Sequence, residues 1–243
     1  MPEEGVTDHA EVARGMAELG GVRLSEQTLD DLLEFIVSLA RASLGGADGV
    51  SVSLIDAGVP ITTNSSDDVV RELDGVQYAA DEGPCIDAMK FGEPVQVALA
   101  DEIDRYPRFS PAAMQRFITG MLSTPLKVLE ETTGALNVYS ASVTRFDEDD
   151  VEMAGQFAAQ ASILLANGAA YAAAVRKSDQ LQIALQSRDL IGQAKGVLME
   201  RTGCSAEEAF DMLRRTSQHS NRKLTSVAEE VVAFPRRAHD DSD

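Results

Sequence analysis

From Asp147 onward the sequence keeps a helical pattern that no proline interrupts before Pro235. A proline inside a helix removes a hydrogen bond and breaks or kinks the helix, so its absence permits a very long one. Acidic residues at 147–150 suit a helix N-terminus. Apolar residues then follow at helical spacing: Val151, Ala154, Phe157, Ala158, Ala161, Leu164 and Leu165. We expect one long helix, with Gly168 as its weak point, that leads into the last 50 or so residues.

Before this helix, the apolar pattern changes between the helical period and the period of two that is typical of strands. Strands are predicted at Gly49–Ile55, Val59–Thr63, Pro94–Val97, Met121–Leu129 and Ala135–Ser140. Helices are predicted at His9–Leu19, Ser25–Leu44, Asp67–Leu73, Cys85–Lys90 and Pro107–Ile118. Turns at 56–58 and 130–134 are expected to form hairpins. This order predicts an α+β domain, an antiparallel sheet with helices to one side.

The C-terminal segment predicts three helices. The first ends near Arg201, because Gly203 is a helix stop. The second opens at Ser205, and Glu208 three residues later completes a capping box. The third is expected to start at Thr225 or Ser226, with the same capping spacing to Glu229, and to end before Pro235. The fold class is therefore an α+β domain joined by a long helix to an all-α three-helix domain.

Charge is distributed unevenly along the chain, whose formal net charge is −19. Residues 1–180 contain 12 basic and 30 acidic residues, whereas residues 181–234 contain 7 of each. The stretch Met212–Ala228 contains Arg214, Arg215, Arg222 and Lys223 and no acidic residue. Such a stretch could receive nucleic-acid phosphates in an otherwise acidic protein. A solvated basic helix end is the alternative.

A helical wheel separates two faces before Arg201. Leu190, Ile191, Ala194, Val197 and Leu198 form a predicted core face, and Arg201 falls towards that side. The opposite face gathers Arg188, Gly192, Lys195, Gly196 and Met199. Two glycines inside a helix cost roughly 1 kcal/mol each relative to alanine, so we expect a partner to approach them closely. RNA and another protein helix both remain open.

On the second C-terminal helix, the predicted core positions are Ala206, Ala209, Phe210, Leu213 and Thr216. With Phe210 directed inward, no exposed aromatic side chain is expected for base stacking. Arg214 and Arg215 lie outward, within helical reach of Asp211. The following loop, 217–223, is expected to have no such acidic partner.

Other features of the sequence argue against several classes of protein. The only cysteines, Cys85 and Cys204, lie far apart, and 3 histidines offer no pair at ligand spacing. A disulfide and a metal site are therefore not expected. No phosphate-binding loop or serine-nucleophile motif occurs, so the chain is not expected to be an enzyme. No apolar run of about 18 residues and no secretory h-region is seen, which favours a cytoplasmic protein that does not contact a membrane.

Two groups of motifs resemble known regulatory families. IGQAKGVLMER, AEEAFDMLRRTSQ and NRKLTSVAEE closely resemble the ANTAR domain, a three-helix RNA-binding module of bacterial antiterminators. Upstream, GVSVSLID, GVQYAADEGPCIDAM, GEPVQV, STPLKV and TGALNVYS resemble a GAF sensor domain, as joined to ANTAR in actinobacterial regulators. The implied organisation is an N-terminal extension with a short helix (1–24), a GAF domain (25–165), a helical linker (166–180), an ANTAR domain (181–234) and a disordered tail (235–243).

The ANTAR resemblance implies binding to paired stem-loops in nascent mRNA, in competition with a terminator hairpin, and no DNA partner. The matched positions are Gln193, Lys195, Arg201, Arg214, Arg215, Ser217, Asn221, Arg222 and Lys223, to which the wheel adds Gly192 and Gly196. Small residues at Ala169–Ala174 favour close helix packing and suggest a homodimer through the long helix. The alternative function is a protein-interaction module acting through the acidic GAF domain. A catalytic GAF domain would need a resolving cysteine or a metal cluster.

The GAF resemblance implies a pocket for an unidentified small molecule, and no cofactor is assigned. Candidate pocket residues are Tyr78, Cys85, Tyr106, Phe109 and Met114, although each is also typical of an ordinary core. Cys85 could be a redox or chromophore-attachment site or simply a small buried residue. The nearby Asp81, Glu82 and Asp87 are expected to disfavour its thiolate.

Overall fold

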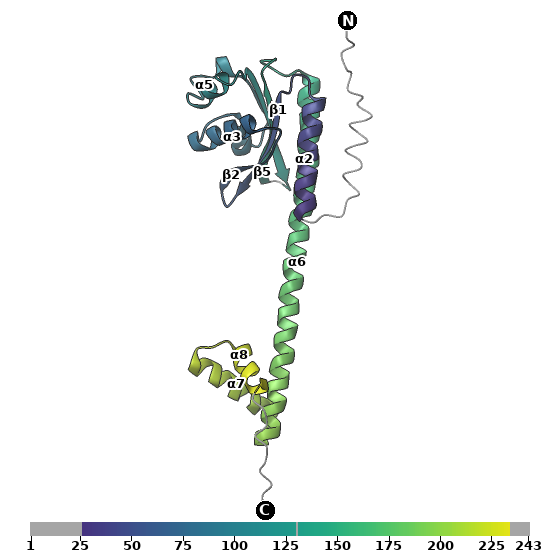
Figure 1. Cartoon of the computed structure of the whole chain (residues 1–243), viewed down its shortest axis with the longest axis vertical. Helices are drawn as coiled ribbons and strands as arrows, with labels where there is room; N and C mark the ends of the chain where they lie inside the picture. Colours follow the sequence, from purple (N-terminus) through teal and green to yellow (C-terminus); the bar gives the residue numbers. More distant parts are fainter. Residues whose placement is uncertain (1–25, 130, 234–243) are drawn as a thin grey trace, which may run out of the picture. The chain divides into compact units, whose positions relative to one another are not determined.

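The computed structural model describes residues 26–129 and 131–233 (Figure 1). The predicted helix His9–Leu19 and the predicted disordered tail both lie outside these residues. The chain divides into two compact units, residues 1–172 and residues 173–243. Each unit is described by itself below.

The first unit is built on a five-stranded antiparallel sheet with the order β2-β1-β5-β4-β3. Its strands are β1 (Gly49–Asp56), β2 (Val59–Ser65), β3 (Val95–Ala98), β4 (Gly120–Val128) and β5 (Glu131–Ser140). Both predicted hairpins, β1–β2 and β4–β5, are confirmed. The second hairpin is tighter than predicted, since Gly134 already pairs with Leu54 and Leu126 as part of β5.

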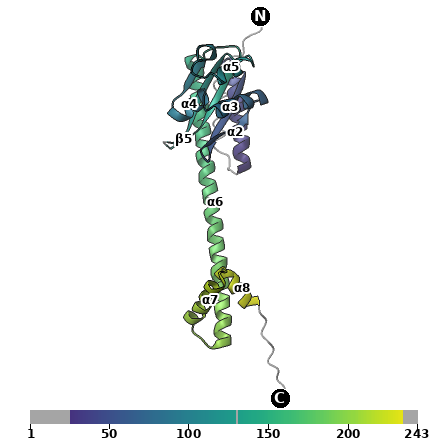
Figure 2. The same cartoon turned by 90° about the vertical axis from the view of Figure 1, so that its left-hand side faces the viewer.

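Helices cover both faces of this sheet, and not one side as predicted (Figures 1 and 2). On one face lie α2 (Glu26–Ser43) and the first part of α6 (Glu148–Thr202). On the other lie α3 (Asp68–Ala80), α4 (Pro84–Phe91) and α5 (Phe109–Met114), with a short 3-10 helix, η1 (Leu99–Asp101). The helix α3 is longer than predicted and α5 is shorter.

The small polar residues of β1 explain this difference. Val50 and Val52 pack in the core under α2 and α6. Ser51 and Ser53 alternate with them and are also fully buried. Because serine in an alternating strand usually marks the solvent face, the sequence pattern predicted an open face where a second layer of helices packs.

The predicted long helix is confirmed as α6, which runs for 55 residues without interruption at Gly168. A side chain at Gly168 would place its Cβ 2.7 Å from a Leu29 methyl carbon, so this glycine allows α2 to lie close to α6. The two helices are also tied at their other ends, where the Gly45 amide donates to the Asp150 carboxylate at 2.7 Å.

By length and composition alone, α6 is the one helix within the described residues that could cross a membrane. Many of its apolar residues in the first unit are core residues: Ala154, Phe157, Ala158, Ala161 and Leu164 are buried against the sheet and α2.

The second unit consists of the last part of α6, α7 (Ala206–Ser220) and α8 (Leu224–Ala233), and confirms the three-helix prediction. The capping box between Ser205 and Glu208 is present. Its core contains Ala194, Leu213, Val227 and Ala228, supported by Leu190, Ile191 and Leu198 from the predicted face of α6. The third helix begins earlier than predicted, since the Val227 amide already donates to the Lys223 carbonyl at 3.2 Å.

Candidate functional site

The turn between α7 and α8 is shaped by two of the predicted RNA-binding residues. Asn221 has a left-handed backbone (φ 51°) and terminates α7. The Ser217 hydroxyl donates to the Arg222 carbonyl at 2.5 Å, and the Arg222 amide donates to the Ser217 carbonyl at 3.1 Å. Asparagine tolerates the left-handed conformation at a helix end better than most residues do. Asn221 and Ser217 therefore have a structural role in this turn.

Arg222 has an acidic partner, contrary to the prediction for this loop. Its guanidinium donates two hydrogen bonds to the Glu230 carboxylate, at 2.9 and 2.6 Å. The pair raises the pKa of Arg222 and lowers that of Glu230. The partner lies on α8, eight residues away in the sequence. The pair could therefore not be predicted from the three- or four-residue spacing of neighbours on one helix. Arg214 pairs with Asp211 at 2.8 Å, as its local spacing predicted.

Other predicted cations lie on the surface of the second unit. Arg215 and Lys223 are exposed, and the side chain of neither forms a hydrogen bond or ion pair within the described residues. Arg215 borders a shallow hollow of about 730 Å³ at the end of α7, beside Gln218 and His219. Arg201 is exposed and not buried towards the core. It borders a second hollow of about 250 Å³ that also contains Glu230.

Lys195 occupies a third location, a groove of about 540 Å³ between α6 and α7. The groove is lined by Ala184, Ser187, Arg188, Ile191, Gly192, Lys195 and Phe210. Phe210 is 39% exposed, so its predicted place in the core is wrong. It lies at the edge of the α7 stripe whose centre is formed by the buried Ala209 and Leu213. Arg188 and Phe210 line this groove but were not among the predicted site residues.

Gly192 and Gly196 face open space. A Cβ built on either glycine meets nothing within 4 Å. Packing within the chain therefore does not require these glycines, although each weakens the helix. The candidate interface residues thus occupy three separate parts of the three-helix surface, and Gln193 is an exposed residue on α6.

Four of the five predicted GAF pocket residues belong to one hydrophobic cluster of the first unit. Cys85, Tyr106 and Phe109 are buried in the core under α3, α4 and α5, and Tyr78 packs partly buried against them. Met114 is 40% exposed and does not join this cluster.

Deep in the same layer lies a buried polar network centred on Asp74 of α3. The Tyr139 hydroxyl and the Asn137 amide donate to its Oδ1 at 2.6 and 3.1 Å. The Thr62 hydroxyl donates to its Oδ2 at 2.9 Å. Asn137 also donates to Ser51 and Ser53, which accounts for the buried serines of β1. Burial raises the pKa of Asp74 to about 6, although these hydrogen bonds oppose the increase.

Gln77 connects this network to the EGPC motif. Its side chain donates to the Tyr139 hydroxyl and accepts from the Cys85 amide, both at 2.9 Å. Gly83 has φ 128°, and a Cβ there would lie 2.3 Å from the Gln77 side-chain oxygen. The glycine of this motif therefore serves the close approach of α4 to Gln77.

Cys85 is fully buried, and burial together with the charge of Asp74 raises the pKa of its thiol to about 12. The thiolate is thus disfavoured, but not by the neighbouring acids that the sequence suggested. Glu82 instead accepts from the backbone amides of Arg108 and Phe109, and Asp87 accepts from Tyr106 and Arg105. A neutral buried thiol is a poor nucleophile.

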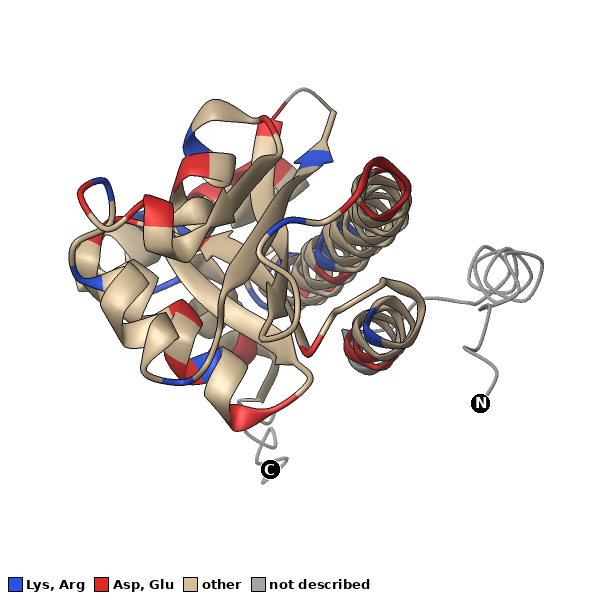
Figure 3. Cartoon of the chain, turned by 90° about the horizontal axis from the view of Figure 1, so that it is seen from above, with Lys and Arg blue, Asp and Glu red and all other residues tan. Residues whose placement is uncertain are grey.

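No cluster of three or more His, Cys, Asp or Glu side chains among the described residues could hold a metal ion. Acidic residues are spread over the helices around the sheet and the start of α6 (Figure 3). Basic side chains face solvent in both units, but in the three-helix unit they are not outnumbered by acidic ones, since residues 181–234 contain 7 of each.

A family model of the GAF domain matches residues 26–166, and one of the ANTAR domain matches residues 179–232. No curated protein matches the sequence. Among solved structures, the GAF domain of a phosphoenolpyruvate-protein phosphotransferase from Coxiella burnetii is similar, with 18% identity and a TM-score of 0.53 over 70% of this chain and 99% of that chain. The free methionine-R-sulfoxide reductase from Neisseria meningitidis has 16% identity and a TM-score of 0.50 over 66% of this chain and 89% of that chain. At these identities the likeness shows the fold alone.

The fold and the matched families define a regulatory protein, in which a sensor-type domain precedes a domain of an RNA-binding class. Both are regulatory rather than catalytic domains, although the GAF fold also occurs in the reductase named above. The chain belongs to the GAF–ANTAR regulators, as its motifs predicted.

Proposed function

We propose that this protein is a transcription antiterminator whose ANTAR domain binds paired stem-loops in nascent mRNA. The observation that supports this most directly is the placement of charge. The ANTAR domain exposes Arg215 and Lys223 without acidic partners among the described residues, whereas residues 1–180 have 18 more acidic than basic residues. Exposed cations in a domain of this family suit phosphate oxygens. Such a function would take place in the cytoplasm, where transcripts are made in bacteria.

We further propose that the protein acts as a homodimer through α6. Ala174, Leu181 and Leu185 share one face of this helix, and Leu181 and Leu185 are 58% and 62% exposed. Exposed leucines at this spacing favour pairing with a second helix. Two protomers would present two ANTAR domains to the two stem-loops.

The GAF domain is proposed to sense a small-molecule or protein signal. Because α6 contributes residues to both units, a signal that favours one arrangement of the paired helices would change how the ANTAR domains are presented. The buried network around Asp74 brings several polar side chains of the GAF domain together, and these could respond to such a signal.

A titration of the full chain with a synthetic two-stem-loop RNA, at two salt concentrations, tests the function. We expect binding that weakens steeply with salt, since phosphate contacts release counterions. The double variant Arg215→Ala/Lys223→Ala should weaken binding and reduce the salt dependence. Lys90→Ala, an exposed cation of the GAF domain, is the control for a general charge effect.

Absence of RNA binding by both the monomeric and the dimeric protein would contradict the proposal. It would favour the alternative function, a protein-interaction module that acts through the acidic GAF domain. Binding that is equally strong in the double variant would place the RNA elsewhere on the protein.

A further inference from the structure

The groove between α6 and α7 combines three features that suit an unpaired RNA base. It contains an exposed aromatic ring (Phe210), two cations (Arg188 and Lys195) and a glycine with open space above it (Gly192). Its volume of about 540 Å³ is in the range of pockets that hold a small planar group. The whole groove lies within the ANTAR unit.

Phe210 is the only large aromatic side chain in the described part of this unit. It is 39% exposed, although α7 has enough apolar residues to bury against α6 without it. Exposing part of a phenyl ring to water is unfavourable, so a ligand that covers the ring would gain affinity from the burial. An unpaired nucleobase can stack on such a ring whatever its sequence.

The side chains of the two cations of the groove are unpaired within residues 173–233. No hydrogen bond or ion pair of the Arg188 or Lys195 side chain is seen there, whereas Arg214 and Arg222 are paired with Asp211 and Glu230. Lys195 is half-buried beside the ring, so its charge is held close to any occupant. Phosphates on either side of a stacked base would supply the missing negative charge.

The open glycine explains how the occupant could reach the ring. Gly192 lies on the groove wall, one helical turn after Arg188 and one before Gly196. A larger side chain there would fit the protein itself but would fill part of the groove. The position is therefore suited to the close approach of an external group.

A second copy of the chain is a less suitable occupant. In a symmetric pairing of α6 with α6, Arg188 and Lys195 of one protomer would approach the same cations of the other. Like charges at a helix interface oppose association. The exposed leucines that suit dimerisation, Leu181 and Leu185, come before this cationic part of the helix.

We propose that an unpaired base of the bound RNA stacks on Phe210, while Arg188 and Lys195 receive the phosphates beside it. This inference rests on the proposed RNA-binding function and identifies where an unpaired base is held. It assigns a role to an aromatic residue and an arginine that motif matching did not select.

The test uses the full chain and a synthetic two-stem-loop RNA that contains the fluorescent base 2-aminopurine in each loop. For the wild-type protein, we expect the fluorescence to be quenched on binding, because stacking quenches this base. In Phe210→Leu, which keeps the apolar volume and loses the ring, we expect about tenfold weaker binding, loss of the quenching and an unchanged salt dependence. Phe35→Leu makes the same change at an exposed phenylalanine of the GAF domain and should have no effect.

Three further variants separate stacking from other roles. Phe210→Tyr should retain both affinity and quenching, because the ring is kept. Lys195→Ala should weaken binding. It should also make the slope of log affinity against log salt concentration shallower by about the amount that one phosphate contact contributes. Gly192→Ala should weaken binding severalfold while raising the melting temperature, since alanine favours the helix. Gly155→Ala, also in α6 with open space above it, should raise the melting temperature without affecting RNA.

Outcomes that overturn the inference differ from those that overturn the proposed function. If wild-type protein binds no RNA, both fail. If RNA binds and Phe210→Leu retains affinity and quenching, only the stacking inference fails. If Phe210→Leu changes self-association in sedimentation and not RNA affinity, the groove is an interface between copies and the inference is also wrong.

Discussion

The guanidinium of Arg222 and the carboxylate of Glu230 form a two-fold hydrogen-bonded pair that joins the α7–α8 turn to α8. Both side chains are exposed, so the pair contributes little to stability. Its main consequence is electrostatic, because an arginine in the most basic stretch of the chain is already neutralised. A phosphate that binds Arg222 must compete with Glu230.

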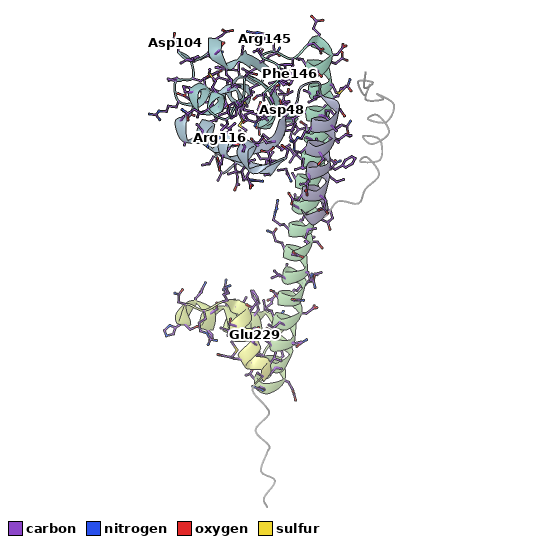
Figure 4. All side chains as sticks on the ribbon, turned by 45° about the horizontal axis from the view of Figure 1, so that its top comes forward. Asp48, Asp104, Arg116, Arg145, Phe146 and Glu229 are labelled. Atoms are coloured by element: carbon purple, nitrogen blue, oxygen red, sulfur yellow. The ribbon has the colours of Figure 1, made fainter. Side chains whose placement is uncertain are left out.

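Removing the acidic partner should therefore strengthen RNA binding. In Glu230→Gln, we expect affinity for the two-stem-loop RNA to rise severalfold, with a steeper salt dependence, because Arg222 becomes free for a phosphate. The unfolding free energy should hardly change, because the pair is exposed to solvent. Glu229→Gln is the matched control: it removes the same charge from α8 (Figure 4), at a residue with no ion pair in the described chain. Equal gains in both variants would mean that only net charge matters.

The buried carboxyl of Asp74 should make the stability of the protein depend on pH. Its pKa is raised from 3.8 to about 6 by burial, so the folded state holds this proton more tightly than the unfolded chain does. The stability gained from the protonated form is complete below about pH 4 and is lost as the pH rises through about 6. By linkage this contribution is on the order of 3 kcal/mol.

Unfolding of wild type and Asp74→Asn, measured between about pH 4 and about pH 7, tests this linkage. The asparagine cannot ionise, so the stability of the variant relative to wild type should increase with pH across this interval. Asp104→Asn, at an exposed position on the outside of the GAF unit (Figure 4), should leave the pH profile unchanged. Parallel profiles for wild type and Asp74→Asn would show that Asp74 does not titrate in this interval.

Two glycines of the GAF domain should respond to alanine in opposite directions. Gly83→Ala should lower the unfolding free energy by roughly 2–4 kcal/mol, because φ 128° is unfavourable for alanine and the new Cβ would clash with Gln77. Gly75→Ala should raise it by about 0.5–1 kcal/mol, because this exposed position inside α3 has open space around it. Urea unfolding measures both. An unchanged unfolding free energy in Gly83→Ala would contradict the close packing of Gln77 on the EGPC turn.

A charge on the proposed dimer face should separate the protomers. Leu181→Lys should raise the dimer dissociation constant at least about tenfold, because a lysine would be desolvated between two helices. Ile183→Lys introduces the same charge at a residue that is 63% exposed on another side of α6, and should leave association unchanged. Sedimentation velocity over a concentration series distinguishes the two. Similar dimer dissociation constants for both variants would place the dimer contact elsewhere.

Local features were predictable because their causes are local. The capping box of Ser205 and Glu208, the end of α6 at Gly203 and the period-two pattern of β1 depend on residues within a few positions of one another. The core face of α6 in the ANTAR domain was also correct except at Val197, since a helical wheel orders the residues of one helix around its axis. Motif resemblance then identified both families over most of the chain.

The errors arose where two elements meet. A wheel places Phe210 beside the core stripe of α7, but only the crossing of α7 and α6 decides whether the ring is covered. The same holds for Arg222, whose partner is on the next helix, and for the serines of β1, which are buried by α3 and its Asp74.

The sequence by itself thus determined which segments form helices and strands, the two domain families and the basic character of the ANTAR stretch, because periodicity, caps and composition act within a segment. Only the tertiary structure decided which charges are neutralised, which serines are buried and that Phe210, Lys195 and Arg188 share a groove. Burial and pairing depend on distances between segments that are far apart in the chain, and these distances exist only after the helices and the sheet have packed.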